Sequence, residues 1–288
     1  MRDLCSTHRT EAVNRARPIL KWAGGKRQII SDLVWSVPEN FNTYYEPFFG
    51  GGALFIELSN RGLLRKSVIS DINGDLMDLY RMVRDRPDDL ANALSSLRFR
   101  NSKDDYYVAR EQYNSMKRES CPEKYALLIY LNRHGYNGLY RVNSRGDFNV
   151  PFGRYENPSL PMASDIYALS DVLKKAQILN ADYREAVKTA SRHDFVYFDP
   201  PYMPINGSSN FTSYSPSGFS EDDQRDLFHT FLDLSEREVF VMESNSGTPF
   251  IEDMYSGFNM FRVKARRNIN SVANLRGPID EIIIRNYD

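Results

Sequence analysis

The sequence predicts an α/β protein in which a largely parallel sheet is covered by helices and interrupted by a helix-rich insert. The first observation is a set of seven apolar, β-rich runs at residues 43–48, 67–72, 176–181, 194–199, 238–244, 259–264 and 280–287. The second is that helical patterns, such as those at 75–85 and 220–235, separate several of these runs. Strands that alternate with helices form parallel sheets covered on both faces.

The last two runs depart from this alternation. A polar, glycine-containing loop without a helical pattern joins 259–264 to 280–287. We therefore expect these two strands to pair antiparallel at one end of the sheet. A mixed seven-stranded sheet of this kind differs from the plain dinucleotide-binding fold.

The middle of the chain breaks the alternation in another way. Helical patterns follow one another at 87–97, 103–118 and 123–135, and a segment rich in glycine, asparagine and aromatic residues then resembles a β-hairpin. We expect this part to be a separate insert. The predicted division is a main domain at 18–75 and 165–288, an insert at 76–164 and an N-terminal extension at 1–17.

Composition limits the classes of function. With 288 residues, 41% of them hydrophobic, the chain can bury a substantial core. Its formal net charge of −1 argues against a protein that coats nucleic acid without specificity. Positive charge is nevertheless concentrated at 133–155 and 262–277, which suits a local basic face.

Two cysteines and four scattered histidines offer neither a disulfide framework nor the spacing of metal ligands, so we expect no metal. No run of eighteen apolar residues is present, and residues 1–17 have no apolar centre. Neither a membrane span nor a secretory signal is therefore predicted, and we expect a cytoplasmic protein without a membrane partner.

A cofactor pocket is suggested where the first two strands end. Gly50, Gly51 and Gly52 follow the first strand and precede a helical pattern, so their backbone can approach a ligand closely. Asp71 ends the next strand, where an acid can accept hydrogen bonds from ribose hydroxyls. The alternatives are a tight strand-to-helix connection for the glycines and a helix cap for Asp71.

The spacing of the glycines departs from G-x-G-x-x-G, so an adenosine cofactor without phosphates fits better than a dinucleotide. A turn at 20–27 adds Lys21, Trp22 and Lys26 ahead of an amphipathic helical pattern. Trp22 is interpreted as the wall of a half-open pocket, with a core aromatic as the alternative.

The stretch DFVYFDPPY at 194–202 predicts a site that binds an NH₂ group and activates its nitrogen as a nucleophile. Asp199 follows an apolar strand, at the edge where open α/β sheets bind ligands. Pro200 and Pro201 fix the backbone and leave carbonyls without competing N–H groups, so a carboxylate and a carbonyl can hold both hydrogens of an NH₂ group. Two such acceptors favour a pyramidal, nucleophilic nitrogen, and Tyr202 can stack on a base. The alternative is a strand that ends in a proline turn.

Six segments in order now carry a family resemblance: LKWAGGKR, EPFFGGGALF, SDINGDLMDLY, LNRHGYNGLYRVNSRGDFNVPFGRY, DFVYFDPPY and NFTSY. The chain resembles Dam-type (DNA adenine methylase) N6-adenine methyltransferases of the class whose recognition insert precedes the Asp-Pro-Pro-Tyr motif. The resemblance implies a Rossmann-like methyltransferase fold, S-adenosylmethionine as methyl donor, and double-stranded DNA as partner. It also implies GATC as target.

The resemblance carries roles over to individual positions. The residues implied to line the cofactor site are Trp22, Lys26, Glu46, Pro47, Phe48, Gly50, Gly52, Asp71, Asp182 and Asp199. Asp199, Pro200 and Tyr202 are implied to hold a flipped adenine, which must leave the duplex because its amine is paired and stacked there.

The insert is implied to be the recognition domain. Tyr136 and Asn137 match positions that fill the vacated stack, and Lys21 matches a lysine that reaches the first guanine. The base-reading hairpin is matched by Leu139, Arg141, Pro151, Arg154 and Tyr155. Arginine can bind guanine O6 and N7 together, and an apolar side chain can touch a thymine methyl group. A solvated, partly packed hairpin is the alternative.

Two features depart from the family pattern. Tyr140 lies where relatives can have a small residue, and residues 1–17 extend beyond the matched region. The basic loop at 266–276 is expected to contact phosphates.

Three other methyl transfers are alternatives to methylation of adenine N6. Transfer to the N4 amine of cytosine uses a similar motif, but serine is commoner there than Asp199. Methylation at cytosine carbon 5 needs a cysteine after a proline, whereas Cys121 precedes Pro122. A protein-glutamine methyltransferase would more often have Asn-Pro-Pro-Tyr. A catalytically silent DNA-binding protein is a rival of another class.

Whether the enzyme is monomeric, and whether it has a cognate restriction endonuclease, stays open.

Overall fold

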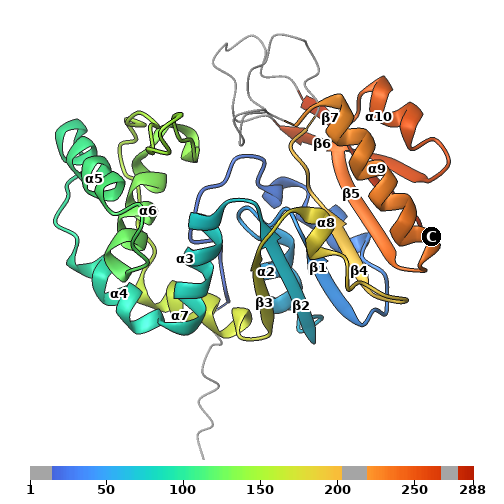
Figure 1. Ribbon diagram of the computed structural model, residues 1–288, viewed down its shortest axis with the longest axis horizontal. Helices are drawn as coiled ribbons and strands as arrows, with labels where there is room; N and C mark the ends of the chain where they lie inside the picture. The colour runs from blue at the N-terminus through green and yellow to red at the C-terminus, as the bar shows by residue number, and fades with distance from the viewer. Residues whose placement is uncertain (1–14, 203–218, 267–277) are drawn as a thin grey trace, which may run out of the picture.

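The structure is a computed structural model that describes residues 15–202, 219–266 and 278–288. Its strands are β1 Thr43–Glu46, β2 Lys66–Asp71, β3 Ala176–Asn180, β4 Phe195–Phe198, β5 Phe240–Ser246, β6 Asn259–Arg266 and β7 Pro278–Arg285. They form one seven-stranded sheet in the order β3-β2-β1-β4-β5-β7-β6 (Figure 1). The predicted seven-stranded sheet is confirmed.

The sheet is parallel except at one end. β3, β2, β1, β4 and β5 are parallel neighbours. β7 lies between β5 and β6 and pairs antiparallel with both. The expected antiparallel pair is therefore present, and the strand that comes last in the chain is inserted inside the sheet rather than added at its edge.

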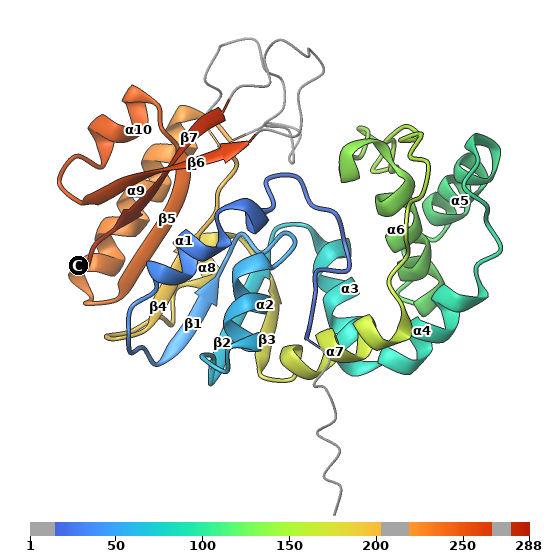
Figure 2. The same cartoon turned by 180° about the vertical axis from the view of Figure 1, so that it is seen from behind.

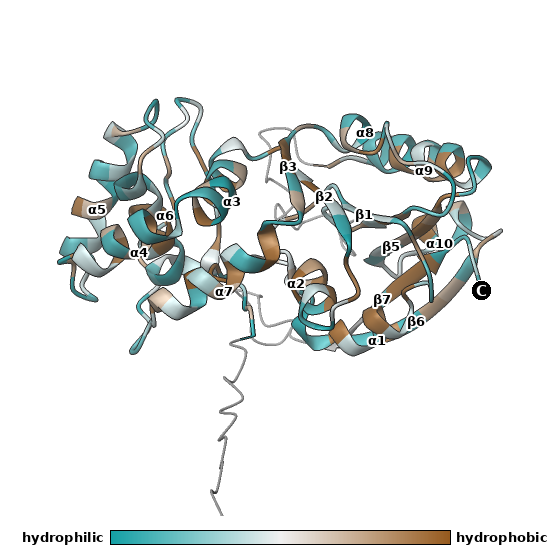
Figure 3. Cartoon of the chain, turned by 90° about the horizontal axis from the view of Figure 1, so that it is seen from below, coloured by the Kyte–Doolittle hydropathy of each residue, from teal (hydrophilic) through white to brown (hydrophobic). Residues whose placement is uncertain are grey.

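Helices cover both faces. The described helices of the main sheet region are η1 Lys26–Gln28, α1 Ile30–Trp35, α2 Ala53–Asn60, α3 Gly74–Asp85, α7 Ala163–Leu173, α8 Tyr183–Ala186, α9 Glu221–Glu236 and α10 Pro249–Met254. Seen from below, α8 and α9 lie on one side of the sheet, and α1, α2 and α7 lie on the other (Figure 3).

Two cores follow from the twofold alternation of strand side chains. Tyr44, Phe195 and Tyr197 belong to one buried cluster, whereas their neighbours Val196 and Phe198 belong to the second, on the opposite face. Because both faces are buried, each parallel strand is an uninterrupted apolar run.

The middle segment forms three helices, α4 Pro87–Ser96, α5 Lys103–Ser115 and α6 Pro122–His134, followed by the short 3-10 helix η2 Tyr136–Gly138. They gather at the end of the molecule farthest from β6 and β7 (Figure 2). Beyond η2 the chain doubles back, with antiparallel bridges between Gly135 and Phe152 and between Val142 and Phe148. This segment, residues 139–155, is called the hairpin below.

The N-terminal part of the described chain is attached to α2. Ala16 is buried, and its backbone exchanges two hydrogen bonds of 3.0 Å with the side chain of Asn60. Among the described residues, no helix is both long enough and apolar enough to cross a membrane.

Candidate active site

The strand order reverses at β1, which has β2 on one side and β4 on the other. Ligands in open α/β sheets bind at such a switch point, beyond the carboxyl ends of the strands. Glu46 is the last residue of β1, and Asp199 directly follows β4. The fold therefore brings together two acids that are 153 positions apart in the printed sequence.

Asp199 lies at the centre of a polar cluster. Lys26 Nζ is 2.6 Å from its Oδ1, and Ser244 Oγ donates to the same oxygen at 3.3 Å. The side chain of Asp199 keeps 22% of its surface exposed, so a substrate can reach it. Burial raises the pKa of Asp199 to about 6, although the charge and hydrogen bond of Lys26 act to lower it. Asp199 is therefore mostly ionised near pH 7.

Lys26 and Tyr202 enclose this carboxylate. Lys26 is 5% exposed, donates to the Gly24 carbonyl at 2.8 Å, and has its Nζ 4.6 Å from the centre of the Tyr202 ring. The hydroxyl of Tyr202 donates to Glu281 on β7, and Glu281 Oε1 is 3.7 Å from Lys26 Nζ. One buried cation thus lies between two carboxylates and above the ring that is expected to stack on a base.

A chain of buried hydrogen bonds holds the Asp-Pro-Pro-Tyr turn from behind. Gln224 Nε2 donates to the Pro201 carbonyl at 3.0 Å, and Gln224 Oε1 accepts from Asn245 Nδ2 at 3.0 Å. Asn245 also donates to Glu243 at 2.8 Å, and Glu243 accepts from the Tyr255 hydroxyl at 2.7 Å. Burial raises the pKa of Glu243 to about 7, against the lowering effect of these two donors. Because the four side chains are fully buried, the turn has a rigid support.

The sequence did not predict Glu281, nor the residues of the hydrogen-bond chain behind the turn, as site residues. Glu243 to Ser246 form a polar run directly after the apolar part of β5, which is the signal that identified Asp199 after β4. Gln224 lies in the first half of a helix whose pattern indicates an ordinary surface helix. Only its position against the Pro201 carbonyl reveals a role.

The glycine turn packs against Trp22. Gly50 and Gly52 have φ of +48° and +62°, a backbone region that favours glycine. A Cβ atom at Gly50 would lie 2.7 Å from Trp22 Cδ1, and the Gly50 N–H donates to Asp71 at 3.0 Å. The glycine is therefore required by the close approach of the indole ring as well as by the turn.

Asp71 is integrated into this turn, since its second oxygen accepts the Asn73 N–H at 2.9 Å. Burial raises the pKa of Asp71, opposed by these backbone donors. The cap of α3 is Asn73, whose side chain accepts from the Leu76 N–H. The alternative reading of Asp71 as the helix cap is therefore wrong.

Glu46 is a second buried acid, 3% exposed. Its Oε2 accepts from the Tyr44 hydroxyl at 2.7 Å and from the Phe55 N–H at 3.1 Å. Burial raises the pKa of Glu46 to about 8, in spite of the Tyr44 hydrogen bond, and the nearby Asp199 raises it further. A cation bound beside Glu46 would favour its ionised form.

The remaining predicted cofactor residues lie beside Glu46 and beyond β3. Pro47 is buried, and Phe48 stacks on Tyr183 with ring centres 5.2 Å apart. Asp182 precedes Tyr183 as the cap of α8, and its carboxylate is 2.9 Å from Arg184 Nε. Phe48 and Asp182 are thus neighbours through Tyr183.

Lys21 is brought to the predicted base-reading residues. Its Nζ lies 3.8 Å from the centre of the Tyr155 ring, and the Tyr155 hydroxyl accepts the Asn137 N–H at 2.9 Å. The backbone of Lys21 exchanges two hydrogen bonds of 2.7 Å with Asn132 of α6. Burial, followed by the charge of Arg133, lowers the pKa of Lys21.

The other predicted DNA-binding residues are distributed around η2 and the hairpin. Tyr136 is 39% exposed, Pro151 is exposed, and Leu139 is half-buried against the core. Arg141 donates to the Asn149 side chain at 2.7 Å. Asn137 and the exposed Arg154 have φ of +55° and +54°, which is strained for residues other than glycine.

Two segments with predicted roles lie in parts of the chain that the structure does not describe. The segment NFTSY at 210–214 and residues 267–276 of the basic loop lie outside the described residues. In the described ranges, no group of three or more histidine, cysteine, aspartate or glutamate side chains is arranged to hold a metal ion.

Comparison with known proteins identifies the family. The family model for D12 class N6 adenine-specific DNA methyltransferases matches residues 22–269. Three relatives each align with 94% of this chain: Type II methyltransferase M1.LlaDCHI of Lactococcus lactis subsp. cremoris (42% identical, 95% of its length), Type II methyltransferase M.MjaIII of Methanocaldococcus jannaschii (41%, 99%) and DNA adenine methylase of Escherichia coli K12 (35%, 95%). The predicted resemblance is confirmed. The chain belongs to the D12 class of N6 adenine-specific DNA methyltransferases.

Proposed function

We propose that the chain transfers a methyl group from S-adenosylmethionine to the N6 amine of an adenine flipped out of duplex DNA, within the target GATC. The observation that carries this proposal is the accessible side chain of Asp199 at the switch point, beside Tyr202 and one strand from the buried Glu46. GATC is the target implied by the resemblance to Dam-type enzymes.

The residues beyond β1, β2 and β3 fit the proposed cofactor. Bound S-adenosylmethionine would supply a methyl group on a positively charged sulfur, together with an ammonium group. Glu46, with a pKa of about 8, is a buried acid that gains a partner when a cation binds. Phe48 offers an aromatic face, and Asp71 and Asp182 offer carboxylates for hydroxyl groups. Trp22 and Lys26 complete the proposed site.

On the substrate side, Asp199 accepts one N6 hydrogen and the Pro200 carbonyl accepts the other. This withdraws the nitrogen lone pair from the ring and makes it available for attack. Positive charge develops on N6 as the methyl group arrives, and the fixed carboxylate of Asp199 stabilises it. One N6 proton must then leave. An Asp199 oxygen can receive it and, with a pKa of about 6, return it to water near pH 7.

Tyr202 supports the adenine ring. Stacking of a base on an aromatic side chain is worth about 1 to 3 kcal/mol. Its hydroxyl bond to Glu281 fixes the far end of the ring, and the Gln224 bond to the Pro201 carbonyl fixes the adjoining peptide. The ring is therefore held at both ends before the base arrives, which reduces the ordering that binding requires.

We further propose that the insert at 76–164 recognises the target. Tyr136 and Asn137 would fill the space left by the adenine, and Lys21, Arg141 and Arg154 would contact guanines. The exposed Tyr136 and the strained backbone at Asn137 and Arg154 support this role.

The experiment is to incubate the protein with labelled S-adenosylmethionine and duplexes containing GATC or its single-base variants, and to map the modified bases. We expect label on adenine N6 within GATC. Asp199→Ala should abolish transfer while DNA binding survives, and Asp171→Ala, at an exposed aspartate of α7, should retain activity. Label on cytosine N4, or appreciable methylation by Asp199→Ala, would refute the proposed mechanism.

A further inference from the structure

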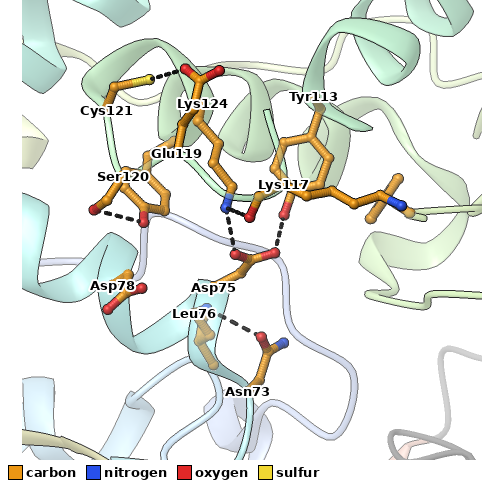
Figure 4. Close-up of polar contacts among 12 residues, drawn as sticks. Asn73, Asp75, Leu76, Asp78, Tyr113, Lys117, Glu119, Ser120, Cys121 and Lys124 are labelled. Carbon is orange, nitrogen blue, oxygen red and sulfur yellow. Dashed lines mark hydrogen bonds and ion pairs between the residues drawn. The ribbon is translucent and has the colours of Figure 1, made fainter. Parts of the chain in front are cut away.

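Asp75 joins the insert to the cofactor side of the molecule. It lies in the first turn of α3, four residues after Asp71. Its Oδ1 is 2.8 Å from Lys124 Nζ of α6, and its Oδ2 accepts from the Tyr113 hydroxyl of α5 at 2.6 Å and from the Tyr140 hydroxyl at 2.9 Å. Figure 4 shows Lys124 and Tyr113 converging on this carboxylate. A single side chain thus ties three segments of the insert to α3.

The three bonds keep Asp75 charged. Burial alone would raise the pKa of Asp75, but Lys124 and the tyrosine hydroxyls outweigh it, so the pKa is lowered. The Lys124 side chain is only 3% exposed and also donates to the Lys117 carbonyl at 3.2 Å. Hydrogen bonds to a charged, partly buried group are stronger than neutral ones.

Tyr140 extends this link to the wall of the cofactor pocket. Its ring stacks on Trp22, with centres 6.2 Å apart and planes inclined by 25°. The indole of Trp22 in turn occupies the space next to Gly50, whose N–H is bonded to Asp71. Tyr140 thus contacts Asp75 through its hydroxyl and Trp22 through its ring.

Tyr140 is also fixed on its hairpin side. Its ring meets Phe148 edge-on at 5.8 Å, and in the chain it lies between Leu139 and Arg141, two of the proposed base-reading residues. A small residue at this position could make neither the Trp22 stack nor the Asp75 hydrogen bond. Tyr140 therefore has a structural use in this chain.

We propose that Tyr140, held by Asp75, is a positioning residue that couples target recognition to cofactor binding. This inference rests on the proposed function, since it needs both ligands. DNA that binds the hairpin would limit the positions open to the Tyr140 ring. A cofactor that packs against Trp22 would limit the positions of the same ring from the other side. Because the bond to Asp75 keeps the Tyr140 ring at one place between the hairpin and Trp22, each ligand stabilises the arrangement to which the other binds, so the two bind with positive cooperativity.

The test measures the binding of a cofactor analogue with and without DNA. S-adenosylhomocysteine, which has no methyl group to transfer, is titrated into the full chain alone and into its complex with the duplex whose methylated site has been mapped. In the wild type we expect the duplex to tighten binding by roughly tenfold or more. Tyr140→Phe keeps the ring and loses the hydroxyl bond to a carboxylate, so this coupling should fall by about tenfold while binding to the DNA-free protein changes little.

Two matched variants separate positioning from general stability. Tyr113→Phe removes a bond to the same Asp75 oxygen and should retain most of the coupling. Tyr167→Phe removes a surface tyrosine–aspartate bond of 2.8 Å to Asp88 and should retain all of it. Thermal unfolding of each variant confirms that it is folded.

The inference is overturned if wild type and Tyr140→Phe show the same coupling, or if Tyr113→Phe loses as much as Tyr140→Phe. A duplex with one base of the target changed should couple less than the target in the wild type, and equal coupling would also overturn it. A wild-type chain that methylates no duplex overturns the proposed function itself, which mapping of the modified bases reveals separately.

Discussion

Replacing Lys26 by methionine should move the acid side of the pH–activity profile to higher pH. Lys26 Nζ lies 2.6 Å from Asp199 Oδ1 in a site where the lysine is 5% exposed. The pKa of Asp199 is about 6, because burial raises it while Lys26 lowers it. A neighbouring opposite charge lowers a carboxyl pKa by about 1 to 3 units, so its removal should place the pKa of Asp199 at roughly 7 to 9.

The direction of the effect follows from the role of the carboxylate. In the proposed mechanism Asp199 must be ionised to accept the N6 hydrogens and balance the developing charge, so activity should be lost as the pH falls through its pKa. With a pKa of about 6, about nine-tenths of the wild-type Asp199 is ionised at pH 7, whereas about one-tenth is ionised when the pKa is about 8. The variant should therefore be about tenfold slower at pH 7 and recover as the pH approaches 9.

The assay is kcat/KM for the duplex between pH 5 and 9.5, with saturating cofactor because Lys26 is also a proposed cofactor contact. Lys21→Met is the matched control, since this lysine lies in the same turn but has its Nζ over the Tyr155 ring. Lys21→Met should weaken DNA binding and leave the acid limb in place. Superimposable profiles for the wild type and Lys26→Met would show that Lys26 does not control the ionisation of Asp199.

Further predictions concern the support of the site, stability and specificity. Gln224→Met removes the donor to the Pro201 carbonyl at nearly constant volume, so single-turnover methylation should slow by roughly tenfold; an unchanged rate would contradict the supporting role. Glu243, with a raised pKa of about 7, stabilises the fold at low pH and loses that contribution as the pH rises through 7. Between pH 5 and pH 9 the free energy of unfolding, measured with urea, should fall by about 3 kcal/mol less in Glu243→Gln than in the wild type. An equal fall in the two proteins would refute this. Arg154→Ala should relax discrimination at one base pair by about 1 to 3 kcal/mol, measured with single-base variants of the target.

Much of the fold could be predicted because its signals are local. A strand buried on both faces is an apolar run, and the helices at 75–85, 103–118 and 220–235 have apolar periodicity along their length. The helix α8 has only four residues, too few for a periodic pattern. α7 and α10 were not predicted either.

The order of the strands is not a local property. Nothing in the run at 280–287 indicates that it lies between β5 and β6, since pairing depends on which edges are free once the parallel strands have assembled. That placement decides the site, because it brings Glu281 of β7 to the hydroxyl of Tyr202, 79 residues away.

The sequence by itself predicted those candidate site residues whose proposed roles follow from their neighbours in the chain. Asp199 is identified by the apolar strand before it and the prolines after it, and the glycines at 50–52 by their place between strand and helix. Only the tertiary structure decided what surrounds them: Gln224 behind the Pro201 carbonyl, and Tyr140 between Asp75 and Trp22. The physical reason is that an ordinary glutamine on a helix or tyrosine in a hairpin acquires a role through packing, and packing joins residues that no sequence period connects.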